Sequence, residues 1–228
     1  MTRKTNARIA GITYLLYIAI AFPGVVLFSR AARGEGIAEK LASIAQHAGD
    51  VRIAAVLSLL GGFAALVLAV TLYSITRDED KDLAMLAMTC RIAEGVGGEL
   101  FLIGTLGLLW LATATGADAP DPAAAQALAA FLLKARPWNT IISAMSFAVG
   151  STLFCYLLLR GRMIPIPLAW LGVVASVLLV VALPVQLTGL FDGPVFDLVW
   201  LPMAVFEIVV AVWFIVKGVG PPTKQHEE

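Results

Sequence analysis

The sequence predicts an all-α, polytopic membrane protein with six transmembrane helices and two short surface helices on the outer side. Apolar residues make up 60% of the 228-residue chain and charged residues only 14%, against roughly 45–50% and about 25% in soluble domains. The mean hydropathy is +0.89. Apolar runs recur at the length of about 20 residues that crosses a bilayer core, and no run alternates as a β-strand does. We therefore expect one membrane domain over residues 1–228.

Six apolar runs are long enough to span a membrane. The first follows Arg3, Lys4 and Arg8, as a signal peptide would, but its apolar stretch is too long for one and predicts a retained helix. The six runs cover residues 9–29, 53–76, 83–111, 138–159, 163–190 and 197–216, and residues 217–228 are expected to form a short cytoplasmic tail.

The connections between the runs differ in length. Residues 77–82, 160–162 and 191–194 are predicted to be tight turns. The connection formed by residues 30–52 is longer. Apolar residues recur in it at helical spacing, which predicts the first surface helix. The alternative is a loop helix that only covers the ends of the spans. The apolar positions are Ile37, Leu41 and Ile44.

The second long connection, residues 112–137, has its own start and stop signals. Asp121 followed by Pro122 is typical of an N-cap with proline at the first helical position. These residues predict a short helix over 123–135 that ends at Pro137. Here too the alternative is a helix that covers the ends of the spans.

The distribution of Lys and Arg predicts the orientation, because cytoplasmic connections carry an excess of basic residues. The side with both termini holds nine, namely Arg3, Lys4, Arg8, Arg77, Lys81, Arg160, Arg162, Lys217 and Lys224. The other side holds six, namely Arg30, Arg33, Lys40, Arg52, Lys134 and Arg136. Both termini are therefore expected to be cytoplasmic.

Composition also argues against several functions. Lys plus Arg and Asp plus Glu both number 16, so the basic excess needed for nucleic-acid binding is absent. Cys90 and Cys155 form no metal or redox motif, and His47 and His226 show no metal-ligand spacing. We expect no metal, no cofactor and no catalytic residues, and an enzyme is the less favoured interpretation.

Four Asp, Glu, Lys or Arg residues fall inside the predicted spans away from their ends, where each costs roughly 2.5–3.5 kcal/mol on insertion scales. Arg91, Glu94 and Glu99 lie in the third run, and Glu207 lies in the last. Arg91 and Glu94 are three positions apart, within ion-pair reach on a helix. We expect this pair to stay ionised, and Glu99 or Glu207 to be protonated. Two further residues, Asn139 and Gln186, are candidates for lining a cavity.

Short motifs along nearly the whole chain resemble the bacterial domain-of-unknown-function 4386 family. They are Ala7-Arg8-Ile9-Ala10-Gly11, Tyr14-Leu15-Leu16-Tyr17, Arg91-Ile92-Ala93-Glu94, Tyr156 to Arg160, Ile164-Pro165, Trp170-Leu171-Gly172, and Pro202, Glu207, Trp213, Lys217 and Gly218. One departure is Trp138-Asn139, where many members have a histidine. The resemblance implies a multi-pass protein, expected in the bacterial inner (cytoplasmic) membrane, and implies no reaction.

One interpretation of the buried carboxylates is an enzyme in which two of them act as an acid/base pair. Two other functional hypotheses also remain open. The first is a small transporter, or a proton- or cation-coupled protein, that uses the buried carboxylates. Glu99 and Glu207 would then lie on the third helix of each half, as in inverted-repeat transporters. The alternative is a structural or accessory protein that binds lipid or a partner membrane protein, with the charges as scaffold. Membrane lipids are the expected partners, a homo-oligomer is allowed by either hypothesis, and a cavity reaching Glu99 or Glu207 would favour the first.

Overall fold

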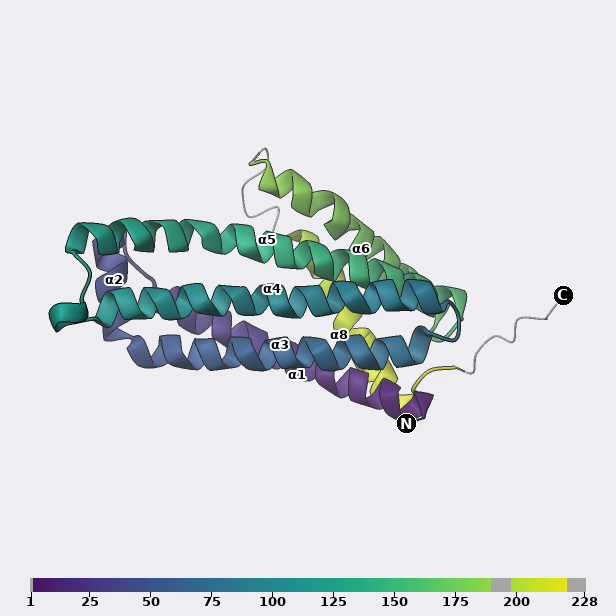
Figure 1. Ribbon diagram of the computed structural model, residues 1–228. Helices are drawn as coiled ribbons and strands as arrows, with labels where there is room; N and C mark the ends of the chain where they lie inside the picture. The colour runs from purple at the N-terminus through teal and green to yellow at the C-terminus, as the bar shows by residue number, and fades with distance from the viewer. Residues whose placement is uncertain (1, 190–197, 221–228) are drawn as a thin grey trace.

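The structure, a computed structural model, describes residues 2–189 and 198–220 and contains helices but no strand within these ranges (Figure 1). Six helices are long and apolar enough to cross a membrane, which confirms the predicted fold class. They are α1 (Arg3–Ala31), α3 (Ala48–Thr76), α4 (Lys81–Thr113), α5 (Pro122–Arg160), α6 (Ile166–Leu187), and the short η2 (Leu198–Trp200) continued by α8 (Leu201–Val216). The predicted turn at 191–194 and tail residues 221–228 lie outside the described residues.

The smaller helices lie at one end of the bundle. Helix α2 (Ile37–Gln46) is the short helix predicted between the first two spans, and η1 (Gly116–Asp118) follows α4. Ile44 of α2 is fully buried, and its neighbours include Phe28 of α1 and Leu108 of α4. Because α2 packs across the ends of α1, α3, α4 and α5, it closes this end of the bundle.

The prediction of a separate surface helix over 123–135 is wrong. Asp121 caps the helix as expected, since its side chain accepts hydrogen bonds from the backbone N–H groups of Ala123 and Ala124 at 3.0 and 3.3 Å. The helix then continues through Pro137 to Arg160 as the 39-residue α5. A proline removes only one backbone hydrogen bond, and membrane helices tolerate this loss where neighbouring helices support them. At 1.5 Å per residue α5 is about 58 Å long, well beyond a bilayer core of ~30 Å.

The six long helices form a ring in the order α1, α3, α4, α5, α6, α8, and α8 returns to contact α1. Each helix packs mainly against its two neighbours in this order. The described ends of the chain lie at the same end of the ring (Figure 1), where the backbone N–H of Gly220 donates to the carbonyl of Met163 at 3.0 Å. An even number of spans requires both termini to be on one side of the membrane.

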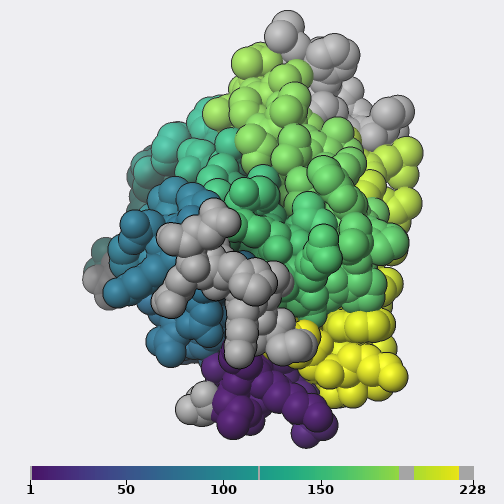
Figure 2. Space-filling model, turned by 90° about the vertical axis from the view of Figure 1, so that its right-hand side faces the viewer, coloured from purple at the N-terminus to yellow at the C-terminus, as the bar shows by residue number. Residues whose placement is uncertain are grey.

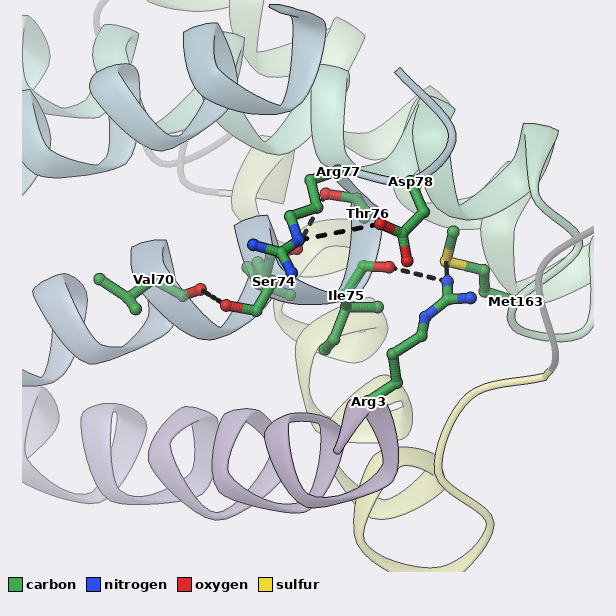
Figure 3. A network of polar contacts seen from close by, with 9 residues as sticks. Arg3, Val70, Ser74, Ile75, Thr76, Arg77, Asp78 and Met163 are labelled. Atoms are coloured by element: carbon green, nitrogen blue, oxygen red, sulfur yellow. Dashed lines mark hydrogen bonds and ion pairs between the residues drawn. The ribbon is translucent and has the colours of Figure 1, made fainter. Parts of the chain in front are cut away.

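The end of the ring that carries the termini is held by side-chain contacts. Arg3 donates from Nη2 to the carbonyl of Ile75 at 2.7 Å and contacts Sδ of Met163 at 3.3 Å (Figure 3). These bonds join the start of α1 to the end of α3 and to the turn before α6. Figure 2 looks onto this end of the ring, where the start of α1, the turn between α3 and α4, and the end of α8 lie on one face of the molecule.

The outward faces of the helices are apolar. Large side chains more than half exposed include Phe22 on α1, Ile103 on α4, Phe131 on α5 and Val181 on α6. A soluble monomer rarely exposes so much apolar surface, whereas lipid tails accept it. This surface is consistent with lipid around the ring, as expected of a multi-pass membrane protein.

Candidate functional site

A cavity of about 470 Å³ lies inside the ring. Its wall is formed by α1, α3, α4, α5, η2 and α8, and the cavity is partly open to the outside of the protein. This volume is typical of sites that bind small molecules. Glycines such as Gly61 and Gly98 form part of the wall, and a Cβ added at Gly98 would meet no atom within 4 Å. The space is therefore left partly by the small residues on α3 and α4.

The structure brings Arg91 and Glu94 together beside this cavity, at the distance of the predicted ion pair. Nη1 of Arg91 is 3.0 Å from Oε2 of Glu94, and the two side chains are 1% and 9% exposed. Tyr17 of α1 donates its hydroxyl to Oε1 of Glu94 at 3.2 Å. The Arg91 guanidinium also lies over the ring of Phe147 on α5, 4.8 Å from its centroid. Both oxygens of Glu94 are thus occupied, and the pair links α4 to α1 and α5.

Arg91 fits because α5 approaches α4 closely at a glycine. A Cβ added at Gly150 would lie 3.0 Å from Cβ of Cys90, 3.1 Å from the carbonyl oxygen of Ala87 and 3.3 Å from Cγ of Arg91. No larger residue fits there without a shift of the two helices. The glycine therefore encloses the Arg91 side chain between α4 and α5.

Glu207 on α8 is the second carboxylate that lines the cavity. Glu207 is 8% exposed, and its side chain forms part of the cavity wall. Its Oε1 is buried and accepts no hydrogen bond from the residues that the structure describes. Arg91 and Glu94 interact with it electrostatically. Glu207 lies nine positions from both ends of the segment Leu198–Val216, so it is about 13 Å from either end.

The structure does not bring Glu99 into this group. Its side chain is half-buried, lies against Gly62 of α3, and is not part of the cavity wall. A Cβ added at Gly62 would be 2.6 Å from Oε1 of Glu99. Five positions separate Glu94 from Glu99, which places them about 140° apart around a helix. Glu99 therefore occupies the contact between α3 and α4 and does not share the cavity with Glu207.

Arg136 on α5 also lines the cavity, and sequence reasoning missed it because it was assigned to an outer connection. Its guanidinium carbon lies over two aromatic rings, 3.6 Å from the centroid of Phe28 and 3.9 Å from that of Phe101. Its Nη1 is buried and has no hydrogen-bond partner among the described residues. The signal that could have found it is the continuous apolar pattern on both sides of Pro137.

The two polar residues predicted to line a cavity lie in different places. Asn139 lines the central cavity and donates from Nδ2 to the carbonyl of Gly97 at 3.1 Å. Gln186 lines a second cavity of about 420 Å³ between α5, α6 and η2. Four residues belong to the walls of both cavities and lie between the two spaces, namely Arg136, Thr140, Ala144 and Trp200.

A family model described as "Domain of unknown function (DUF4386)" matches residues 9–218. The chain belongs to the DUF4386 family. The matched region contains every residue of the central cavity, from Tyr17 to Glu207. No curated protein and no solved structure matches this DUF4386 protein.

Within residues 2–189 and 198–220, no group of three or more His, Cys, Asp or Glu side chains is placed to hold a metal ion. The side chains of Tyr17, Glu94, Glu207 and Arg136 in the cavity wall can form hydrogen bonds and charge pairs, and a carboxylate can take up a proton.

Proposed function

We propose that this protein is a proton-linked membrane transporter of a small amphipathic molecule, with the central cavity as the binding site and Glu207 as the proton carrier. The observation that carries the proposal is that the cavity reaches Glu207, whose Oε1 has no donor among the described residues. Ionisable groups inside a membrane commonly mark proton and substrate pathways. The cavity wall is otherwise mainly apolar and aromatic, which suits a ligand with an apolar body.

The two carboxylates at the cavity have different roles in this proposal. Glu94 already accepts from Tyr17 and pairs with Arg91, so it is a fixed part of the scaffold. Oε1 of Glu207 has no such partner among the described residues, and protonation removes the charge of this carboxylate from a low-dielectric site. Taking up a proton from one side and releasing it to the other would couple proton movement to the solute in the cavity.

The test is solute uptake into proteoliposomes under an imposed pH gradient. The panel consists of neutral, anionic and cationic solutes with the same alkyl chain. We expect gradient-dependent uptake of at least one of them, which Glu207→Gln abolishes and Glu99→Gln preserves. Glu99 is the matched control because it is a carboxylate in the same bundle that does not line the cavity. Equal loss from both variants, or uptake no faster than in protein-free liposomes, would overturn the proposal.

The alternative is an accessory membrane protein that binds lipid or a partner membrane protein. One observation favours it: Arg91, Glu94, Tyr17 and Phe147 connect three helices, as a purely structural cluster would. This alternative predicts that Glu207→Gln changes thermal stability but leaves uptake at the level of protein-free liposomes in every case.

The protein is further proposed to lie in a bacterial inner membrane with both termini in the cytoplasm. The excess of Lys and Arg at the end that carries the termini supports this orientation. Arg3 and Arg160 belong to that end, where Arg3 binds the carbonyl of Ile75 and Arg160 pairs with Asp80 at 3.4 Å.

A further inference from the structure

We infer that the end of the cavity around Arg136 is an oxyanion-binding site, so that the solute is an amphipathic organic anion. Such a solute has an apolar body and one carboxylate or phosphate group. The inference rests on the proposed function in that it requires a small molecule in the central cavity, but it requires neither transport nor proton coupling.

The first argument is the way Arg136 is held. Its guanidinium carbon lies over two aromatic rings, 3.6 Å from the centroid of Phe28 and 3.9 Å from that of Phe101. Stacking on aromatic rings uses the flat face of a guanidinium and not the N–H donors at its edge. That edge matches the two oxygens of a carboxylate or phosphate. Since Nη1 is buried without a partner in the described part of the chain, a bound oxyanion would satisfy it.

The second argument is the charge that the cavity presents. A guanidinium cannot lose its proton in a protein, whereas a carboxylic acid can be neutral. Arg91 and Glu94 compensate each other at 3.0 Å, and protonation neutralises Glu207 when it carries its proton. The remaining permanent charge on the wall is then the cation of Arg136, among the residues that the structure describes. A low-dielectric cavity with this charge attracts an anion and repels a cation.

The third argument is the surroundings of Arg136. Ser143 lies seven positions further along α5, on the same helix face, and lines the same cavity. Its Oγ is buried and also lacks a hydrogen-bond partner among the described residues, which makes it a second donor. Beyond it the wall becomes apolar and aromatic at Phe147 and Trp200, whose rings are 6.2 Å apart. Phe147 is eleven positions from Arg136, or about 16 Å along the helix axis, which leaves room for an apolar body.

The deciding experiment is equilibrium binding to the purified wild-type protein by isothermal titration calorimetry. The probes are nonanoate, octyl phosphate and octyltrimethylammonium, which share an octyl chain and differ in charge. We expect at least one of the two anions to bind roughly tenfold or more tightly than the cation, because charge-assisted hydrogen bonds contribute on this scale. Equal affinities, or tighter binding of the cation, would overturn the inference.

The variants locate the site. Arg136→Gln is expected to remove the preference for the anion, and Arg136→Lys to restore only part of it, because an ammonium lacks the planar pair of donors. Arg52→Gln is the matched control, since Arg52 is an exposed arginine of α3 that does not line the cavity. Unchanged anion binding by a folded Arg136→Gln protein would refute the assignment. If that variant does not fold, the comparison of the three probes on the wild-type protein still decides whether the protein prefers an anion.

A phosphate group can come from a lipid head group or from a free acid. The protein in nanodiscs containing phosphatidate distinguishes the two by native mass spectrometry. Bound phosphatidate that octyl phosphate cannot displace identifies a lipid head group, and displacement identifies a free acid. If no anion binds, the uptake of neutral and cationic solutes still tests the proposed function separately.

Discussion

Arg91 forms its ion pair within its own helix, with Glu94 one turn away at 3.0 Å and with both side chains almost fully buried. Nε, Nη1 and Nη2 of Arg91 all lack a hydrogen-bond partner among the described residues, so the guanidinium depends on the nearby charge of Glu94 and on the ring of Phe147 for compensation. Removing one partner of such a pair leaves an uncompensated charge at low dielectric.

A double-mutant cycle on Arg91→Met and Glu94→Gln tests this dependence. We expect either single substitution to destabilise the protein by about 3–5 kcal/mol, and the double variant to lose clearly less than the sum. The measurement is unfolding in detergent, followed by circular dichroism. Arg160 and Asp80 are the control pair, 3.4 Å apart but 37% and 31% exposed, so their coupling should stay below about 1 kcal/mol. Strictly additive effects at Arg91 and Glu94 would mean that they do not stabilise each other.

Tyr17 gives a second test of the same cluster from α1. Tyr17→Phe removes the hydroxyl that donates to Glu94 at 3.2 Å and is expected to cost about 1–3 kcal/mol, as for a hydrogen bond to a charged group. The control is Tyr156→Phe, because Tyr156 is 45% exposed on α5. A Tyr17→Phe protein as stable as the Tyr156→Phe protein would show that the bond does not stabilise the fold.

Close contacts between helices depend on glycines at particular positions. A Cβ added at Gly11 of α1 would lie 2.5 Å from the carbonyl oxygen of Ala211 on α8 and 2.8 Å from Cγ1 of Ile215. The backbone atom cannot rotate away as a side chain can. Small residues of this kind let membrane helices approach each other, and Gly11 does so where the first and last helices of the ring meet.

Gly11→Ala is therefore expected to lower the free energy of unfolding by about 1–3 kcal/mol, as overpacking does. Gly49→Ala is the control, because a Cβ at Gly49 of α3 meets no atom within 4 Å. There alanine should be neutral or stabilise by up to about 1 kcal/mol, since glycine is a poor helix former. Thermal unfolding of the two variants decides, and a decrease of equal size in both would contradict the packing argument.

The helices were more predictable from the sequence than the site. Span number follows from apolar length alone, and the pairing of Arg91 with Glu94 follows from their spacing. Two errors had local causes. Pro137 was interpreted as a helix end, although a proline in a supported membrane helix removes only one hydrogen bond, and this placed Arg136 outside the spans. Glu99 was grouped with Glu94 because both lie on a broad face of one helix, whereas the helices on either side divide that face.

The cavity was not predictable for a further reason. It arises from the order in which six helices close a ring, and this order depends on contacts between segments far apart in the sequence. Nothing in the local pattern near Glu207 shows that α1 and α8 meet. The chain order of the helices is known from the sequence, but their neighbours across the ring are not.

The orientation of the whole molecule can be tested by cysteine labelling in intact cells, with Cys90 and Cys155 replaced by serine. Exposed positions on α2 and at the start of α5, Ala42→Cys and Ala124→Cys, should react with a membrane-impermeant maleimide. Lys81→Cys, exposed at the opposite end of the bundle, should react only after the cells are permeabilised. The reverse pattern would place both termini outside the cell.

The ring has a consequence for how the protein is made. Around the ring of six long helices, each neighbour follows the last along the chain except where α8 meets α1, so five spans must enter the membrane before the ring can close. During that interval Arg91 and Glu94 are already compensated inside α4, three positions apart. The helix can therefore leave the translocation machinery with its charges paired, before any partner arrives. Glu207 enters last, on the helix whose insertion completes the cavity.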